Sequence, residues 1–419
     1  MQRDHERIDE AAAQAQKAAM TDRFTGSFTQ QEPIPEDGIE AALTVLRNGR
    51  LHRYNVVPGE LSQAALLEQE FAAYTGARFC LAVSSGGYAI TTALRAVGVG
   101  HGDPVLTNAF TLAPVPGAIA AVGGKAIFVG VTEGLTIDLD DLEAKAGQAK
   151  VLLLSHMRGH ICDMDRLMAI CDAAGITVIE DCAHTMGGAW AGVASGRHGA
   201  VGCYSTQTYK HMNSGEGGLL ITDDEDIAAR AVLMSGSYML YERHLAAPAP
   251  EVFERHKYDM PNISGRMDNL RAAILRPQLK ILDDQVARWN TRYKLIEDGL
   301  RGTPGLSVIE RPAEETYVGS SIQALLLDWT AEDIRQVVAR CSARGVELKW
   351  FGAPEPTAFT STYGHWKYAP SDPLPESDRI LHAILDMRVP LTFSEDDCRT
   401  IAAIIRAEVG AVHQAPAQA

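Results

Sequence analysis

Two polar segments of the chain hold residues that could do covalent chemistry. Lys210 lies in Tyr204–Gly218 (YSTQTYKHMNSGEGG), a segment with few charged residues. Such a segment can leave the lysine side chain partly desolvated. A partly desolvated lysine has a lowered pKa and becomes a usable nucleophile. Asp181 ends the apolar run Thr177–Glu180, with His184 three residues later, and its carboxylate could pair with a cationic group of a ligand. In isolation, Lys210 fits a solvated loop lysine better, and Asp181 fits a helix cap about as well as a ligand contact.

A third segment, Ser84–Ile90 (SSGGYAI), could bind an anion. An apolar run ends there, a Ser/Gly turn follows, and a helix is expected to begin at Tyr88. The free amides of a first helical turn attract anions, and Gly86 and Gly87 would let a phosphate approach the backbone closely. Such turns are common, so this one alone indicates little. Together the three segments supply a phosphate cup, a carboxylate and a nucleophilic lysine, the set that pyridoxal 5'-phosphate (PLP) requires.

Alternating amphipathic helices and short apolar runs must position these segments. Helices are expected at Ile39–Asn48, Ser62–Tyr74 and Tyr88–Val97. Buried strands are expected at Cys80–Val83, Val105–Thr107, Ala126–Val129, Val151–Ser155, Thr177–Glu180, Gly202–Ser205 and Gly218–Thr222. Short apolar strands separated by helices predict an α/β fold whose mostly parallel sheet is covered on both faces. The loops at the carboxyl ends of such strands build the ligand site, where all three segments fall.

The rest of the chain predicts a bridge and a second, smaller α+β domain. A helical pattern from Met267 to about Ala287 should kink at Pro277. Beyond it we expect strands and helices at Ser320–Leu327, Val346–Trp350, Ala331–Ala343 and Ser394–Glu408. The predicted division is a polar, partly helical and loosely attached extension (1–35), a large domain (36–285), a small domain (286–412) and a tail (413–419).

The composition excludes several classes of protein. The chain has 419 residues, 46% hydrophobic and 22% charged, with a net charge of −15. This acidic balance argues against nucleic-acid binding, which needs a basic footprint. The seven cysteines lack paired metal-ligand spacing and predict buried free thiols in a reducing compartment and no metal site. The charged N-terminus and the lack of a bilayer-length apolar stretch predict a cytoplasmic protein without membrane contact.

Five motifs occur in an order that resembles one known family. They are Ser84–Ile90, Gly159–Asp165 (GHICDMD), Ile179–His184 (IEDCAH), Ser205–Gly218, and Arg266–Ala273 followed by Gln278-Leu279. The chain resembles the DegT/DnrJ/EryC1/StrS family of fold-type-I PLP aminotransferases from about Ile39 to the C-terminus. The resemblance implies a three-layer fold, PLP as cofactor, and transfer of an amino group from an amino-acid donor, glutamate or glutamine, to a keto acceptor. Family acceptors include nucleotide-linked sugars and cyclitols.

The resemblance also implies roles for single residues. Lys210 would hold PLP covalently and move the substrate proton, while Asp181 would pair with the ring nitrogen. His184 would lie near the ring 3-oxygen. The phosphate would be held by Ser205 and the glycine turn, Gly86, Gly87 and Tyr88. Family enzymes are homodimers that share active sites, and Asn262 is the candidate that reaches into the partner's site.

The chain departs from the family pattern at several positions. Leu112 stands where relatives carry an aromatic residue that stacks on the cofactor, and Gly87 stands where threonine is common. Asn262 comes two residues early, and Ser264 fills its ungapped place. Relatives with histidine in place of the lysine are dehydratases, and His211 follows Lys210 directly, although counts from both sides put lysine at the catalytic position.

The identity of the substrate stays open. Arg158 or Lys349 could meet an anionic group of the acceptor, or serve only packing or surface charge. Two alternatives to the aminotransferase remain: a PLP-dependent dehydratase or lyase on the same scaffold, and a non-catalytic ligand-binding regulator.

Overall fold

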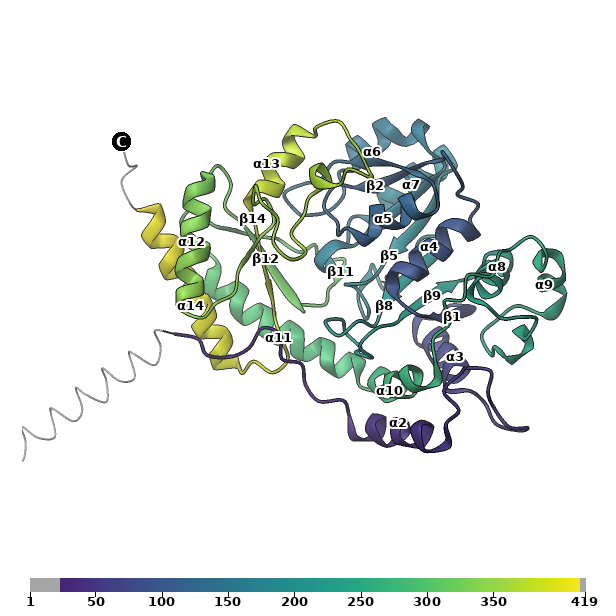
Figure 1. The fold of residues 1–419 in the computed structure, drawn as a ribbon. Coiled ribbons are helices and arrows are strands. Elements are labelled where there is room, and N and C mark those ends of the chain that lie inside the picture. Colours follow the sequence, from purple (N-terminus) through teal and green to yellow (C-terminus); the bar gives the residue numbers. More distant parts are fainter. Residues whose placement is uncertain (1–22, 415–419) are drawn as a thin grey trace, which may run out of the picture.

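The computed structural model describes residues 23–414, centred on a seven-stranded sheet (Figure 1). The strand order is β1-β9-β8-β5-β4-β2-β3. The neighbouring strands β3, β2, β4, β5 and β8 pair in parallel. Within this sheet, only β9 runs antiparallel to its two neighbours, β8 and β1. This confirms the mostly parallel sheet. The strands are β1 (Phe79–Val83), β2 (Pro104–Asn108), β3 (Lys125–Val129), β4 (Val151–Ser155), β5 (Thr177–Asp181), β8 (Val201–Ser205) and β9 (Gly218–Thr222).

Helices cover both faces of this sheet, because successive side chains of each buried strand point to opposite sides. On β1, Leu81 and Val83 join one core with helices α4 (Gly86–Ala96), α5 (Pro114–Ala121) and α8 (Glu225–Ser235). Cys80 and Ala82 join the core on the other face. The helices there are α3 (Gln63–Thr75), α6 (Leu139–Lys145), α7 (Met164–Ala174) and α10 (Asn269–Lys280). The result is the expected three-layer α/β domain.

The bounds of the helices and strands in this domain agree closely with those predicted from the sequence. Each predicted helix and strand of the large domain begins and ends within three residues of the observed one, and Val151–Ser155 and Gly218–Thr222 coincide with β4 and β9. Side-chain caps mark several helix starts: Ser62 accepts from the N–H of Ala65 at the start of α3. The remaining helices of this domain are α2 (Glu36–Asn48) and α9 (Pro250–His256).

The bridge between the domains differs from the prediction. Pro277 lies inside α10, and the break comes at Ile281, before α11 (Leu282–Leu300). The helix therefore continues through Pro277, and the interruption of the helical pattern comes after it. Packing of α10 against α2 and α3 holds the helix on both sides of the proline, which outweighs the loss of one backbone hydrogen bond. The boundary expected between residues 285 and 286 lies within α11.

The smaller unit is a four-stranded antiparallel sheet packed on helices. Its strand order is β10-β12-β14-β13, and α11, α12 and α14 enclose a core with it. Of the expected strand Val346–Trp350, only the last two residues form a strand. The elements are β10 (Ser307–Val308), β12 (Ser321–Leu325), α12 (Ala331–Ala343), β13 (Lys349–Trp350), α13 (Pro375–Ala383), β14 (Ile384–Arg388) and α14 (Glu395–His413). A small sheet beside the main one joins β6 (Ala189–Trp190), β7 (Val193–Ala194) and β11 (Glu315–Thr316).

Residues 23–35, expected to be loosely attached, pack against the smaller unit. Phe24 and Phe28 are buried in its core, and each ring meets Phe393 edge-on with centroids 5.0 Å apart. The prediction for this segment was wrong because two aromatic rings dominate a segment whose average composition is polar. Residues 1–22 of the extension, which was expected to be helical in part, and residues 415–419 of the tail lie outside the described residues.

Candidate active site

A cavity opens at the carboxyl ends of β4, β5 and β8, as predicted. The loop after β8 and the first turns of α4 and α5 complete its wall. Seven of the expected site residues line it: Gly86, Gly87, Leu112, Asp181, His184, Ser205 and Lys210. The other lining residues are Ile90, Pro114, Val115, Ser155, Met157 and Ala183.

The loop that carries Lys210 is fastened at both ends. Thr206 N–H donates to the Gly217 carbonyl at 2.9 Å, which closes the loop between β8 and β9. Gln278 of α10 brackets Asn213: its Oε1 accepts from the Asn213 N–H at 2.8 Å, and its Nε2 donates to the Asn213 carbonyl at 2.8 Å. These hydrogen bonds fix the position of the loop that carries Lys210.

The environment of Lys210 favours its neutral amine form. Its Nζ lies 2.8 Å from Nε2 of His184. Burial lowers the pKa of Lys210 to about 7, with a further lowering from Arg158 that Asp181 partly offsets. Burial, followed by the charge of Lys210, also lowers the pKa of His184 well below its usual range. A neutral His184 can accept a hydrogen bond from Lys210, and a deprotonated Lys210 can attack a carbonyl.

Asp181 lies at the end of β5 with its carboxylate held in place. Oδ2 accepts from Ser155 Oγ at 3.1 Å, and Oδ1 accepts from the Ala183 N–H at 3.2 Å. Burial raises the pKa of Asp181, and the Ala183 hydrogen bond, the charge of Lys210 and the Ser155 hydrogen bond work against that rise. A buried carboxylate in this balance favours a cationic ligand group beside it.

The glycine turn fits closely against β8. A Cβ added to Gly86 would lie 2.8 Å from Cβ of Ser205, so a larger residue would push the helix start away from the strand. A Cβ on Gly87 would meet nothing closer than Ser85 Oγ at 4.0 Å, which leaves room for a ligand. The amide of Tyr88, expected at the phosphate, instead donates to Ser85 Oγ at 3.1 Å. Gly86 and Gly87 are therefore the better placed residues of the turn.

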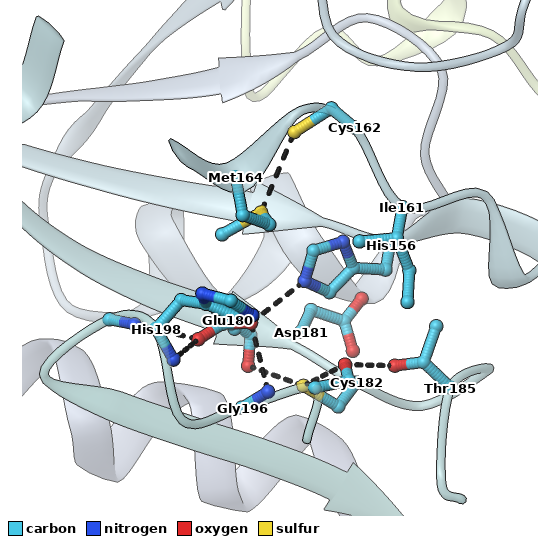
Figure 2. Close-up of polar contacts among 12 residues, drawn as sticks. His156, Ile161, Cys162, Met164, Glu180, Asp181, Cys182, Thr185, Gly196 and His198 are labelled. Carbon is cyan, nitrogen blue, oxygen red and sulfur yellow. Dashed lines mark hydrogen bonds and ion pairs between the residues drawn. The ribbon is translucent and has the colours of Figure 1, made fainter. Parts of the chain in front are cut away.

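A buried hydrogen bond between His156 and Glu180 holds the strand that carries Asp181. Figure 2 shows His156 and Glu180 pointing toward one another, 2.9 Å apart. Glu180 also accepts the backbone N–H groups of Gly196, His198 and Gly199 at 2.7–2.9 Å. Cys182 Sγ lies within 4.8 Å of the His156 and Glu180 ligand atoms. Because Glu180 already accepts four hydrogen bonds, we interpret this cluster as a structural anchor for the loop Gly196–Gly199.

These residues fit PLP. An aldehyde needs a neutral amine, which Lys210 offers, and a protonated pyridine nitrogen needs a carboxylate, which Asp181 offers. Leu112 and Met157 give the cavity apolar walls for a ring. The turn at Gly86 and Gly87 with the Ser205 hydroxyl offers the donors that a phosphate needs.

Comparison with known proteins agrees with this chemistry. The model of the DegT/DnrJ/EryC1/StrS aminotransferase family matches residues 35–406. The chain belongs to this family. It is 30% identical over 297 residues to L-glutamine:scyllo-inosose aminotransferase of Streptomyces griseus, covering 70% of this chain and 68% of that protein. It is 32% identical over 246 residues to 3-amino-5-hydroxybenzoate synthase of Amycolatopsis mediterranei, covering 57% of this chain and 60% of that protein.

Solved structures support the fold. The crystal structure of a 3-amino-5-hydroxybenzoic acid synthase superposes with a TM-score of 0.78 at 24% identity, over 92% of this chain and 99% of that one. The likeness shows that the chain has the fold-type-I architecture. The protein is accordingly a PLP-dependent aminotransferase of the DegT/DnrJ/EryC1/StrS family.

His211 does not line the cavity, although its neighbour Lys210 does. His211 Nε2 lies 3.0 Å from Ser320 Oγ, and its ring meets Trp289 edge-on. Burial lowers the pKa of His211 to about 3. The histidine packs between the domains, while the lysine enters the cavity. The geometry therefore favours the lysine as the reacting residue.

The remaining expected residues lie in different places. Arg158 is buried beside Lys210 and lines an adjoining pocket. Within residues 23–414, Lys349 lines neither this pocket nor the cavity. Asn262 is exposed, and its Oδ1 accepts from the N–H and Oγ of Ser264 at 3.1 Å. Asn262 does not line the cavity of its own subunit.

The aminotransferase site contains residues that sequence reasoning missed. Ser155 ends β4 next to Asp181, so its place at a strand end could have identified it. Arg388 and Tyr209 line the pocket beside Lys210. Arg388 gave no local signal, because β14 comes from the other domain and reaches the site only through tertiary packing.

Proposed function

We propose that Lys210 carries PLP and moves the substrate proton, and that Asp181 pairs with the ring nitrogen. The observation that supports this most is that Lys210 and Asp181 line one cavity together with the Gly86–Gly87 turn and Ser205. Ser205 and the two glycines would hold the phosphate. Leu112 would pack against the ring without aromatic stacking, and His184 would lie near the ring oxygen.

The chain's own residues account for the proton movements of the reaction. PLP supplies an aldehyde that stores the amino group between donor and acceptor, and a ring that takes up electrons. Lys210 Nζ, whose pKa is lowered to about 7, would in its neutral form take the proton from the α-carbon of the donor. His184 would hold Nζ in place through its 2.8 Å contact. Leu112 and Met157 would keep water from the reacting carbon.

We propose L-glutamine or L-glutamate as the donor and a keto group on a cyclitol, a nucleotide-linked sugar or a related carbocycle as the acceptor. The names of two relatives support this. One is an L-glutamine:scyllo-inosose aminotransferase and the other a 3-amino-5-hydroxybenzoate synthase. The family resemblance supports the same classes.

A spectral donor screen tests this function. Addition of L-glutamine or L-glutamate to PLP-loaded protein should convert the absorbance of the bound cofactor to that of its amino form, and a suitable ketone should reverse it. Turnover of an amino or hydroxy substrate without any keto partner would instead indicate a dehydratase or lyase. Purified protein that takes up no PLP would indicate the non-catalytic regulator.

The rate of PLP attachment should depend on the charge of Lys210. Because the pKa of Lys210 is lowered to about 7, the amine is charged and unreactive below pH 7 and neutral above it. The attachment rate of the cofactor-free protein should therefore rise through an apparent pKa near 7 and then level off. Stopped-flow absorbance between pH 5.5 and 9 measures this. A rise centred above pH 9 would contradict a desolvated lysine.

We propose that the protein forms a homodimer in which Asn262 reaches the partner's site. The surface near Asn262 supports this, because three large apolar side chains are exposed beside it: Tyr238 (61%), Met239 (49%) and Ile263 (40%). Exposed apolar clusters of this kind mark interfaces. Light scattering should give twice the chain mass, and a monomeric mass would contradict the proposal.

We also propose a cytoplasmic location. Within residues 23–414, none of the helices has the length and apolar character needed to cross a bilayer. All seven cysteines are buried free thiols, which suits a reducing compartment.

A further inference from the structure

Four consecutive residues of the large domain, Arg158–Ile161, are each held by a side chain that follows α11 in the sequence. Each makes one hydrogen bond of 2.6–2.9 Å to such a side chain. The pairs are Arg158 with Asp386, Gly159 with Arg311, His160 with Gln323, and Ile161 with Glu315. Ser155 and Met157, which precede this segment, line the cavity. The segment therefore joins the wall of the cavity to the smaller domain.

The register of the small sheet brings two of these partners together. Gln323 and Asp386 lie opposite one another in the antiparallel pair β12–β14, and opposite residues of such a pair point to the same face. Gln323 Nε2 donates to Asp386 Oδ1 at 2.7 Å, while Gln323 Oε1 accepts from His160 Nε2 at 2.8 Å. One oxygen of Asp386 is thus fixed by its own sheet, and the other, Oδ2, accepts from Arg158 Nη2.

Arg158 depends on Asp386 for its place. Both side chains are buried, and within residues 23–414 Asp386 is the one carboxylate that forms an ion pair with Arg158. Arg158 Nε is buried without a hydrogen-bond partner in this part of the chain, and its φ of +58° is a costly backbone conformation for an arginine. A buried charge stays out of water only when it is paired. Loss of the carboxylate should therefore release the guanidinium into water.

The guanidinium of Arg158 belongs to the surroundings of the reacting amine. Arg158 and Lys210 line one pocket beside the cavity, and a positive charge disfavours a second one on a neighbouring amine. After burial, the charge of Arg158 lowers the pKa of Lys210 most. The other titratable groups around this amine come from β5, from the segments that follow β5 and β8, and from β14: Asp181, His184, Tyr209, His211 and Arg388.

We propose that Asp386 and Gln323 are positioning residues, which hold the Arg158 guanidinium beside Lys210 so that the smaller domain controls the reactivity of this amine. Arg158 acts through its charge, and the two residues of the small sheet act through Arg158. The inference rests on the proposed role of Lys210 as the reacting amine.

The reactivity of Lys210 can be measured without the cofactor. Acetic anhydride acylates uncharged amines, so its rate of labelling Lys210 in the cofactor-free full chain, followed by mass spectrometry from about pH 5.5 to about pH 10, gives a midpoint for this one amine. Access of the reagent changes the plateau and leaves the midpoint alone. Arg158→Gln removes a neighbouring positive charge and should raise the midpoint by about 1 pH unit. Arg158→Lys keeps the charge without the planar fork and should lie between.

The sign of the Asp386→Asn effect separates positioning from a direct effect of charge. A carboxylate that acts through its own charge raises the pKa of a nearby amine, so its loss would lower the midpoint. If Asp386 instead holds Arg158, the released guanidinium leaves Lys210, and the midpoint should rise toward that of Arg158→Gln. The double variant should then show no shift beyond that of Arg158→Gln alone, because the effects of residues that act through one another do not add.

Two further variants complete the set. Gln323→Met removes the second hydrogen bond to Asp386 and should raise the midpoint by less than Asp386→Asn does. It takes the place of Asp386→Asn if that variant does not fold, as judged by its thermal midpoint. Arg399→Gln is the matched control, because this arginine of α14 has a side chain 53% exposed and does not line the pocket. The labelling midpoint of Lys210 should stay at the wild-type value in this control.

An upward shift that Arg158→Gln and Asp386→Asn share supports the proposal. It is overturned if the midpoint of Asp386→Asn stays at the wild-type value or falls, or if Arg158→Gln matches the Arg399→Gln control. The proposed function fails separately, when no amino donor converts the bound cofactor of the wild type. The labelling of Lys210 then still tests whether the small sheet acts on this amine through Arg158.

Discussion

Replacing Lys210 with alanine should abolish amine transfer and leave the fold intact. The variant loses both the amine that holds PLP and the base that moves the substrate proton. Positioned proton transfer alone contributes about 10²- to 10⁴-fold, and covalent attachment adds to it, so the rate should fall by at least about 10⁴-fold. The measurement is single-turnover conversion of bound cofactor with L-glutamine.

The thermal midpoint of Lys210→Ala should stay level or rise. Burial lowers the pKa of Lys210, which means that the folded state disfavours its charge, and removing the amine removes that cost. Lys294→Ala is the control, because this α11 lysine has a side chain 54% exposed and does not line the cavity. It pairs with the exposed Asp298 and the buried Glu297. It should retain full activity. Residual transfer in Lys210→Ala within 100-fold of the wild type would assign the base to another group.

The residues of the site that sequence reasoning reached share one property. Lys210, Asp181 and Ser205 follow apolar strands of a parallel sheet, and the carboxyl ends of such strands meet at one edge. Local pattern was therefore enough to predict that these side chains converge. The glycine turn was predicted for the same reason, although the N-cap bond of Ser85 to the Tyr88 amide needed coordinates.

The features that sequence reasoning did not predict depend on packing between segments that are distant in the sequence. Arg388 reaches the pocket because β14 pairs with β12 and the small domain closes on the large one, and no nearby residue signals this. Phe24 and Phe28 were hidden in a polar segment, and their burial depends on Phe393. Pro277 stays helical because its neighbours hold α10. In each case a tertiary contact outweighs a local preference.

Replacing Asp181 with asparagine should lower the rate of amine transfer by about 10²- to 10³-fold, the effect of removing one preorganised electrostatic contact. The change keeps the shape of the side chain and can keep the Oδ1 contact with the Ala183 N–H, but it removes the charge that would hold a proton on the ring nitrogen. Ser155→Ala removes only the 3.1 Å hydrogen bond to Oδ2 and should cost several-fold, about 1 kcal/mol.

The pH profile separates this effect from a change at the lysine. Asp181 raises the pKa of Lys210, so removing its charge should lower that pKa further and keep the amine neutral across the working range. The attachment rate of PLP should then reach its plateau at a lower pH than in the wild type, while amine transfer remains slow at every pH. Recovery of wild-type transfer rates above pH 8 would instead show that Asp181 acts only through Lys210. A loss that persists at high pH places the role of Asp181 at the cofactor ring.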